Sequence, residues 1–414
     1  MSPVVAGWTG SGPVAEHWGM RSSPAPWFVR PGARDWRCEP PPVAARRFHV
    51  DLPGYRPTPL VDLPALAEEL GVGRVLVKDE SSRLGLPAFK VLGASWGIAC
   101  ELARRAGLPG PVGLDRLREV VAADPVMLVT ATDGNHGRAV ARMASLLGAP
   151  AHIVVPEVLS AASADAIAAE GAAVERIAGD YDGAVRHAAG LTAGRADAVL
   201  IQDVAWPGYE RVPGWIVQGY ATLMLEVDAA LPALGIDGPD LVVVPVGVGS
   251  LAQAVIAHCR SRTGGAAVRH CRSRTGGAAV RHCRSRTGGA AVLGVEPEAA
   301  ACVLASLRAD RLRTVSTGET VMVGLVCGTP SSAAWPYLRA GLDAATAVGD
   351  AEATGAVADL AALGVSSGPS GAAALAGARA ALTGPYARSR RADLGVDGDS
   401  VVVLLSTEGR GSGS

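Results

Sequence analysis

Short apolar runs alternate with longer amphipathic or alanine-rich stretches over most of this chain. The apolar runs are rich in Val, Leu and Ile and predict buried strands at 74–80, 125–131, 151–157, 198–204, 241–250, 291–298 and 401–409. The stretches between them predict helices, the clearest of them over 63–70, from Lys90 onward and over 215–231. Strands that alternate with helices of this length predict an α/β fold, in which mostly parallel sheets are flanked by helices.

The 414 residues are long enough for two or three domains or lobes. Residues 1–50 are rich in Pro, Arg and Trp and show no clear period. We therefore expect them to form an irregular N-terminal arm that lies on the main body.

A tandem repeat interrupts the chain between a predicted helix and a predicted strand. The sequence HCRSRTGGAAVR occurs at 258–269 and again at 270–281, and a third copy begins at His282, so the repeat region covers 258–292. Its period matches no repeat architecture with a packed core, and Gly-Gly breaks each copy, so we predict a surface loop. A metal site made from the His-Cys pairs is an alternative, but their spacing is not that of usual ligands and no metal is expected.

Charge and composition exclude several classes of protein. The 414 residues carry a formal net charge of −1, which provides no broad field to attract nucleic acid or a membrane surface. No apolar stretch approaches the roughly 20 residues of a membrane helix, and the first residues do not resemble a signal peptide. Seven cysteines in a chain of this length do not form a disulfide framework. These features favour a cytoplasmic protein.

The two lysines are the most informative part of the composition. Only Lys78 and Lys90 are lysines among the 38 basic side chains. Arginine stays charged, whereas lysine can lose its proton and form an imine with an aldehyde, a reaction for which arginine cannot substitute. Lys90 stands at the start of a predicted helix in PAFKVLGA and is the candidate for this chemistry. Lys78 stands next to Asp79 and Glu80, so we expect it to form a structural ion pair.

Other polar or glycine-rich segments follow predicted strands and complete a candidate site. Gly247, Val248, Gly249 and Ser250 lead from a buried strand into a helix, as a phosphate-binding loop does, although many such segments are only tight turns. Thr132, Asp133, Gly134, Asn135 and His136 open another helix, where backbone N–H groups could bind a carboxylate. Ser406 and Thr407 end the last strand, where a hydroxyl could meet a pyridine nitrogen. With Lys90, these are the parts that a pyridoxal 5′-phosphate (PLP) site needs.

Four of these segments resemble a known group of enzymes. PAFKVLGA, TDGNHG, GVGS and LLSTEG occur in the order and approximate spacing of the fold-type II PLP enzymes, the group of tryptophan synthase β and threonine dehydratase. Within this group the chain is most similar to the diaminopropionate ammonia-lyases. The similarity lies in KDESSRLGLPAFKVLGAS, ATDGNHGRAVA, QDVAWPGYERVPGWIVQGYATL, VEPEAAAC, GLVCGTP and LLSTEG. The chain departs from the pattern in its tandem repeat, and in GVGSL where the wider group often has four glycines.

The resemblance implies two domains, each built on its own mostly parallel sheet. The large domain would comprise residues 51–124 and 204–414, and the small domain residues 125–203.

The resemblance also implies an activity and a role for each candidate residue. The ammonia-lyases convert 2,3-diaminopropionate to pyruvate and ammonia by α,β-elimination. Lys90 would hold the cofactor, Asn135 would lie near its 3′-oxygen, residues 247–250 would bind its phosphate, and Ser406 or Thr407 would meet its ring nitrogen. Residues 132–136 would bind the substrate, a small amino acid. Asp133 and Asp203 would handle the proton of the D- and L-enantiomer respectively, and the protein would be a homodimer.

Alternatives remain open for the activity and for single residues. The enzymatic alternative is a serine/threonine dehydratase-like lyase, and the alternative from another class is an inactive PLP-binding sensor or scaffold. Asp133 alone would also fit a helix N-cap, and Asp203 a structural ion pair. For His136 a purely structural hydrogen bond is favoured over a role as a base.

Overall fold

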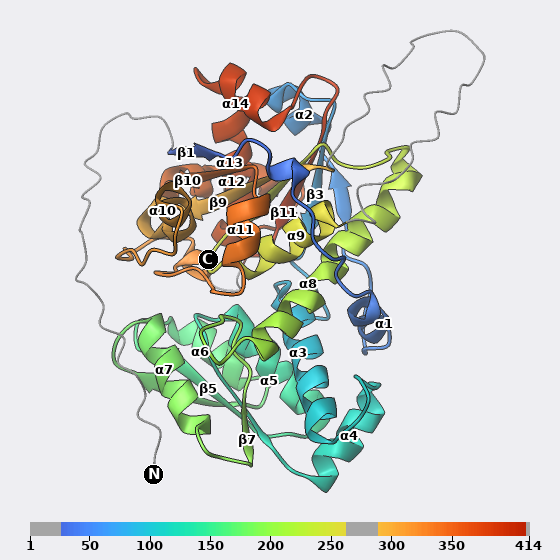
Figure 1. The fold of residues 1–414 in the computed structure, drawn as a ribbon, viewed down its shortest axis with the longest axis vertical. Helices are drawn as coiled ribbons and strands as arrows, with labels where there is room; N and C mark the ends of the chain where they lie inside the picture. Colours follow the sequence, from blue (N-terminus) through green and yellow to red (C-terminus); the bar gives the residue numbers. More distant parts are fainter. Residues whose placement is uncertain (1–25, 262–288, 411–414) are drawn as a thin grey trace.

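The computed structural model describes residues 26–261 and 289–410, which form two lobes (Figure 1). The larger lobe is built on a seven-stranded sheet in the order β1-β10-β9-β8-β11-β3-β2. Its five central strands run parallel, and the two edge strands β1 and β2 are antiparallel to their neighbours. The strands are β1 (Trp27–Val29), β2 (Leu60–Asp62), β3 (Arg74–Asp79), β8 (Leu241–Pro245), β9 (Ala291–Pro297), β10 (Ala344–Val348) and β11 (Val401–Ser406).

Helices cover both faces of this sheet because its central strands are apolar on both sides. On one face Val402 and Leu404 of β11 belong to an apolar cluster with α13, and on the other Val403 and Leu405 belong to a cluster with α8 and α9. The helices of the larger lobe are α2 (Pro64–Leu70), α9 (Ser250–Arg260), α10 (Cys302–Ala309), α11 (Trp335–Gly341), α12 (Asp350–Ala362), α13 (Pro369–Leu382) and α14 (Ala387–Leu394). Short 3-10 turns lie at Ala33–Asp35, Leu231–Leu234, Glu298–Ala300 and Val323–Leu325.

The smaller lobe is built on a four-stranded, fully parallel sheet in the order β6-β5-β4-β7. Its strands are β4 (Met127–Ala131), β5 (Ala151–Pro156), β6 (Ala173–Ile177) and β7 (Ala198–Leu200). The helices drawn with it are α3 (Lys90–Arg105), α4 (Leu114–Ala123), α5 (Asn135–Leu147), α6 (Ala161–Ala168) and α7 (Tyr181–Thr192) (Figure 1). The predicted α/β fold with two mostly parallel sheets flanked by helices is therefore confirmed.

The long helix α8 (Arg211–Ala230) connects the two lobes, since it packs against α3 on one side and α9 on the other (Figure 1). Glycine makes the contact with α3 close. A Cβ atom at Gly219 would lie 2.3 Å from the carbonyl oxygen of Leu92, and one at Gly93 would lie 2.4 Å from the ring of Tyr220. This packing holds the first turn of α3, which begins at Lys90, against the body of the larger lobe.

Two regions differ in detail from what the sequence predicts. Residues 1–25 of the predicted irregular arm lie outside the described residues, and residues 26–50 contain β1 and the helix α1 (Ala44–Val50). The proposed domain boundaries stay a prediction, and α3 and α4, which they assign to the large domain, pack against α5 of the smaller lobe.

Most of the predicted repeat loop lies outside the described residues, but its two ends are described. A Cβ at Gly289, in the last part of the repeat, would lie 2.5 Å from the carbonyl oxygen of Cys259, near the end of α9. The chain therefore returns close to the point at which it leaves.

Candidate functional site

The candidate residues gather where strands of both sheets end. The carboxyl ends of parallel strands in α/β folds are the usual position of ligand sites. Lys90 comes after β3, residues 132–136 after β4, Asp203 after β7, residues 247–250 after β8, and Ser406 and Thr407 at the end of β11. The site thus lies between the two lobes.

Lys90 and Asp203 form the central contact. The Lys90 amine donates a hydrogen bond to Asp203 Oδ2 at 2.6 Å, and the two side chains are 21% and 4% exposed. Burial alone would lower the pKa of Lys90, but the nearby Asp203 carboxylate raises it above the ordinary lysine value. Burial likewise raises the pKa of Asp203, but Lys90 and His136 outweigh it, so the net pKa is below the ordinary aspartate value. Both groups are therefore held in their charged forms.

The loop after β4 is shaped by Thr132. Its hydroxyl accepts hydrogen bonds from the backbone N–H groups of Gly134 at 2.9 Å and Gly137 at 3.0 Å. Gly134 has a φ of 141°, which L side chains rarely adopt, and it occupies the N-cap position of α5 without a side-chain cap. The Asp133 side chain therefore does not cap this helix, and the alternative interpretation as an N-cap is wrong.

Asp133 is half-buried within electrostatic range of Lys90. Burial raises its pKa to about 6; Lys90 opposes this shift, while the carboxylates of Asp203 and Glu408 add to it. The two aspartates of the site thus have pKa values displaced in opposite directions. Such a separation is typical of carboxylates that do different work in one active site.

His136 lies beside Asp203 on the first turn of α5. Its Nε2 is 2.7 Å from the carbonyl oxygen of Ile201, and its Nδ1 is 3.9 Å from Asp203 Oδ2 without forming a hydrogen bond. Burial lowers the pKa of His136, which favours the neutral ring. A neutral ring bonded to a backbone carbonyl agrees with the structural role favoured from the sequence.

The glycine-rich segment after β8 presents three backbone N–H groups that are suited to a phosphate. Among the described residues, no acceptor binds the backbone N–H groups of Gly247, Val248 and Gly249, which lead into α9. Gly249 has a φ of 95° and so requires glycine. Ser250 ties this segment to the site, since its hydroxyl donates to the backbone oxygen of Asp203 at 2.9 Å. Free N–H groups at the start of a helix are suited to a phosphate, so these residues fit PLP.

The two hydroxyls at the end of β11 differ in their surroundings. Ser406 donates a hydrogen bond to the hydroxyl of Ser367 at 2.8 Å. The Thr407 hydroxyl forms no hydrogen bond with any other described residue, while the Thr407 backbone oxygen accepts from the N–H of Phe89 at 3.2 Å. Thr407 is therefore the hydroxyl that remains available to a ligand.

The structure adds polar residues that the sequence analysis missed. The Tyr181 hydroxyl is 3.4 Å from Asp203 Oδ1 and accepts a hydrogen bond from the side-chain amide of Gln202 at 2.8 Å. Glu408 accepts a hydrogen bond from the amide of Asn135 at 2.7 Å. Glu408 and Gln202 lie inside quoted segments and could have been considered, whereas no signal in the sequence marks Tyr181.

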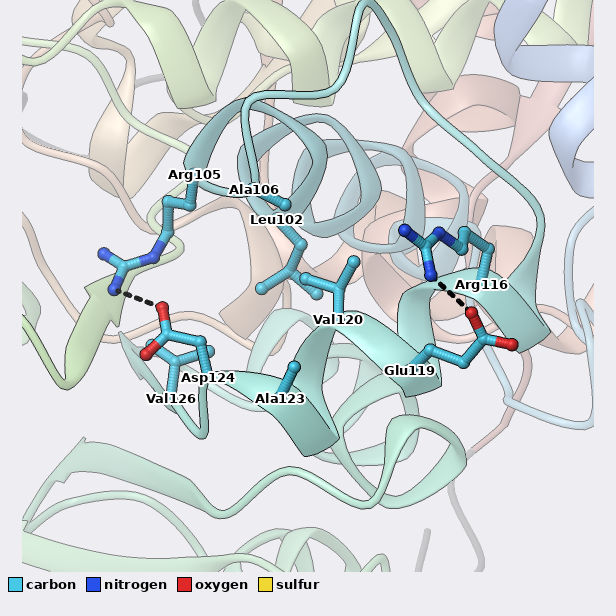
Figure 2. A pocket seen from close by; sticks show the side chains of 9 residues that line it. All are labelled: Leu102, Arg105, Ala106, Arg116, Glu119, Val120, Ala123, Asp124 and Val126. Carbon is cyan, nitrogen blue, oxygen red and sulfur yellow. Dashed lines mark hydrogen bonds and ion pairs between the residues drawn. The ribbon is translucent and has the colours of Figure 1, made fainter.

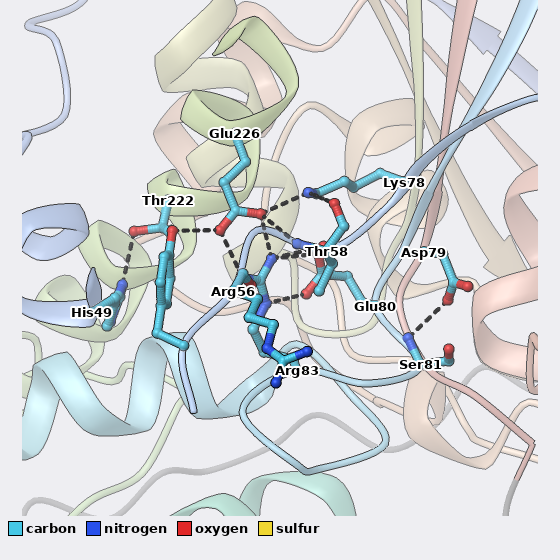
Figure 3. Close-up of polar contacts among 11 residues, drawn as sticks. His49, Arg56, Thr58, Lys78, Asp79, Glu80, Ser81, Arg83, Thr222 and Glu226 are labelled. Carbon is cyan, nitrogen blue, oxygen red and sulfur yellow. Dashed lines mark hydrogen bonds and ion pairs between the residues drawn. The ribbon is translucent and has the colours of Figure 1, made fainter. Parts of the chain in front are cut away.

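Lys78 takes no part in this site. Its amine donates to Glu226 at 2.6 Å and to the backbone oxygen of Thr58 at 2.8 Å, and the side chain is 1% exposed (Figure 3). Arg83 lies in the same cluster and binds both Glu226 and Glu80. The predicted structural ion pair is confirmed, but its partner is Glu226 of α8 and not the adjacent Asp79 or Glu80.

A separate pocket of about 340 Å³ lies between the end of α3 and α4 (Figure 2). Its arginines already have acidic neighbours, since Arg116 is 2.5 Å from Glu119 and Arg105 is 3.9 Å from Asp124. The pocket lies at the other end of α3 from Lys90. Its nearest lining residue on this helix, Leu102, is about 18 Å from Lys90 at 1.5 Å per residue. The pocket is therefore distinct from the candidate site.

Residues 26–261 and 289–410, the part of the chain that the structure describes, contain no group of three or more His, Cys, Asp or Glu residues placed to hold a metal ion. Of the repeated His-Cys pairs, only His258 and Cys259 lie in this part of the chain. None of the described helices has the length and apolar character needed to cross a membrane.

Comparison with known proteins agrees with the geometry. The family described as "Pyridoxal-phosphate dependent enzyme" matches residues 52–407. The chain belongs to this family. It is 34% identical to diaminopropionate ammonia-lyase of Escherichia coli K12 over 378 residues. This alignment covers 88% of this chain and 87% of that protein.

Relatives from the wider group are less similar. The mouse L-serine dehydratase/L-threonine deaminase is 29% identical over 203 residues, or 49% of this chain and 52% of that protein.

Among solved structures, that of the E. coli ammonia-lyase in complex with D-serine has a TM-score of 0.78 at 30% identity, covering 94% of this chain and 95% of that one. The resemblance to the diaminopropionate ammonia-lyases is confirmed, and the cofactor of the family is PLP.

Proposed function

We propose that this chain is a PLP-dependent ammonia-lyase that converts 2,3-diaminopropionate to pyruvate and ammonia. The proposal is supported by the similarity to the E. coli enzyme over most of both chains. The structural observation that carries it is the contact of Lys90 with Asp203 at 2.6 Å, in a site that contains a second carboxylate, Asp133, with a raised pKa.

Lys90 is the residue that would hold the cofactor, since its amine faces the site while that of Lys78 is engaged in a buried cluster. When bound, PLP stabilises the negative charge left on Cα after its proton is removed. The N–H groups of residues 247–249 would bind the phosphate, and Thr407 rather than Ser406 would meet the ring nitrogen, because Ser406 already bonds Ser367.

The two aspartates would divide the proton transfers. A base must approach Cα from the face of the substrate that carries the proton, and D- and L-enantiomers bound by the same carboxylate-binding loop present opposite faces. Asp133 belongs to that loop and Asp203 follows a different strand, β7. We assign Asp133 to the D-enantiomer and Asp203 to the L-enantiomer.

The charge of the site favours diaminopropionate over serine. Among the described residues, the carboxylates of Asp133 and Asp203 lie beside one cation, Lys90, and the second ammonium group of diaminopropionate would be attracted to them. The neutral hydroxyl of serine would not be attracted to these carboxylates in this way. A serine or threonine dehydratase-like activity is the alternative, favoured only by the weaker similarity to that group.

The test combines the cofactor's visible absorbance with pyruvate release from each pure enantiomer. Lys90→Ala should lose the band of the lysine-bound cofactor. Asp133→Asn should lose mainly D-diaminopropionate turnover and Asp203→Asn mainly L-diaminopropionate turnover, by about 100- to 10,000-fold each. Equal losses on both enantiomers in both aspartate variants would contradict the division of work. Faster turnover of serine than of diaminopropionate would favour the alternative, and no turnover at all would favour a sensor or scaffold.

We also propose that the protein is a homodimer in the cytoplasm, as the family resemblance and composition imply. Light scattering of the purified protein at micromolar concentration measures the mass directly. A mass equal to the 41.9 kDa of one chain would contradict the dimer.

A further inference from the structure

Glu408 connects the two lobes at the site, and no role above accounts for it. One oxygen of its carboxylate accepts a hydrogen bond from the Asn135 amide at 2.7 Å, and the other accepts from the backbone N–H of Ser370 at 3.1 Å. Asn135 is the first residue of α5 in the smaller lobe, and Ser370 lies in the first turn of α13 in the larger lobe. A single side chain therefore bridges the starts of two helices.

The backbone around Glu408 also holds the segment before Lys90. Glu408 forms an antiparallel bridge with Ala88, and the N–H of Gly409 donates to the carbonyl oxygen of Pro87 at 2.8 Å. Gly368 leaves room for the carboxylate, since a Cβ there would lie 2.8 Å from Glu408 Oε1. The Lys90 segment, the end of β11 and the loop at Asn135 thus meet at one residue.

The chemistry of the contact fixes the orientation of Asn135. A side-chain amide has a donor end and an acceptor end, whereas an ionised carboxylate can only accept. Asn135 therefore turns its NH₂ group toward Glu408 and its carbonyl oxygen away, and no other described residue binds the second N–H of this amide. A glutamine at position 408 would keep its oxygen on the N–H of Ser370 and turn its own NH₂ group toward Asn135, which would then have to present its carbonyl oxygen.

We propose that Glu408 is a positioning residue, which orients the Asn135 amide and docks the loop of residues 132–136 beside Lys90. The inference deepens the proposed function and rests on it only for the choice of substrate. Two measurements test it. The first is kcat, and the second is the visible circular dichroism of bound PLP, which needs no substrate and reports how the cofactor is oriented.

The experiment compares holoenzymes of wild type and Glu408→Gln. We expect the variant to bind PLP with altered visible circular dichroism and a kcat lowered about 100-fold, as for a misplacement of about 1 Å. Glu170→Gln is the matched control, because Glu170 binds Arg138 on the same helix α5 at 3.0 Å, away from the site. It should lower the melting temperature while the dichroism and kcat stay unchanged.

A reversed pair separates orientation from simple docking. Asn135→Asp places two carboxylates together, and adding Glu408→Gln restores a donor and an acceptor with opposite polarity. We expect the double variant to recover the melting temperature lost in Asn135→Asp, but neither the dichroism nor kcat. Recovery of all three would show that docking alone matters and would overturn the proposal.

Other outcomes also bear on the proposal. Wild-type dichroism and kcat in Glu408→Gln would also overturn it. If that variant does not fold, Glu408→Ala with added acetate or acetamide takes its place. Rescue of the dichroism by acetate alone supports the proposal, since acetate only accepts hydrogen bonds, and equal rescue by both overturns it. Failure of wild type to act on diaminopropionate would count against the proposed function, while the dichroism would still decide the role of Glu408.

Discussion

At the scale of single residues, the site separates two aspartates by their surroundings. Asp203 bonds Lys90 directly, and this contact lowers its pKa below the ordinary value despite its burial. Asp133 lacks so close a cation, and burial together with the neighbouring carboxylates raises its pKa to about 6. Near neutral pH, Asp203 is therefore fully ionised, whereas Asp133 is close to the pH at which it changes charge.

This difference predicts different pH profiles for the two enantiomers. A base must be ionised to accept a proton, so turnover that depends on Asp133 should fall as the pH drops through about 6. Turnover that depends on Asp203 should not fall over this pH range, because the pKa of Asp203 lies lower. We would measure kcat/KM for D- and L-diaminopropionate at on the order of ten pH values between pH 5 and 8 and compare the two pH profiles. A fall in kcat/KM below about pH 6 for the L-enantiomer alone would reverse the assignment of Asp133 and Asp203 to the two enantiomers.

Lys78 should matter for stability and not for cofactor attachment. Lys78→Met leaves the Glu226 carboxylate buried with Arg83 as its remaining cation. Breaking a buried pair typically costs about 3 kcal/mol or more of the free energy of unfolding. Denaturant unfolding measures this loss, and the visible band of the lysine-bound cofactor should persist. Loss of the band from a folded Lys78→Met protein would show that Lys78 acts in the site.

At the scale of elements, glycine controls how closely α3 and α8 approach. Gly219→Ala would place a methyl group 2.3 Å from the carbonyl oxygen of Leu92, a backbone atom that cannot move aside by itself. We expect this variant to lose at least about 2 kcal/mol of unfolding free energy, as in an overpacked core.

The same helix offers a matched control. Gly214 also lies in α8, but no atom lies within 4 Å of the position of an added Cβ. Gly214→Ala should be neutral or stabilise by up to about 1 kcal/mol, because alanine favours helix. Equal destabilisation by both substitutions in denaturant unfolding would show that the close approach is not the cause.

The elements that the sequence predicted correctly are those with a distinct pattern. Val-rich runs such as 241–245 and 401–406 are strands, and Lys90 begins a helix as expected. The helix α13 was missed because its sequence, PSGAAALAGARAAL, is nearly all small and apolar, and most of it is buried. Such a helix presents no polar face and hence no periodicity.

At the site, too, local sequence motifs could be predicted, whereas contacts between distant residues could not. Lys90, the loop 132–136 and the glycine-rich segment were predicted because each is a local motif after a strand. The contact between Asn135 and Glu408 joins residues 273 positions apart, and only the fold brings them together. The structural ion pair of Lys78 was predicted, but its partner could not be named for the same reason, since Glu226 is 148 positions away.

At the scale of the whole molecule, the ends of the repeat region lie close together. Gly289 packs against the carbonyl oxygen of Cys259, and the Arg260 guanidinium is held by the backbone oxygen of Ala290 at 2.7 Å. A short connection is therefore sufficient to join α9 to β9.

Deletion of residues 259–282 should consequently be tolerated. The deletion joins His258 to Cys283 and supplies another Cys-Arg-Ser in place of residues 259–261. Surface loops cost only about 0.6 kcal/mol per doubling of their length, so shortening this one should change stability little. Soluble yield, the melting temperature and the visible cofactor band check this. Loss of soluble protein or of PLP binding would show that the deleted residues are structural.

The burial of Lys78 has a practical consequence for measuring this protein. The chain contains two lysines, and the side chain of one is 1% exposed within an ion cluster, while that of the other, Lys90, is 21% exposed in the site. Lys90 is therefore the one lysine whose amine PLP would reach, and borohydride would fix the cofactor there as a stable secondary amine. The fraction of chains that carry this adduct at Lys90, read by mass spectrometry, then counts the occupied sites in any preparation.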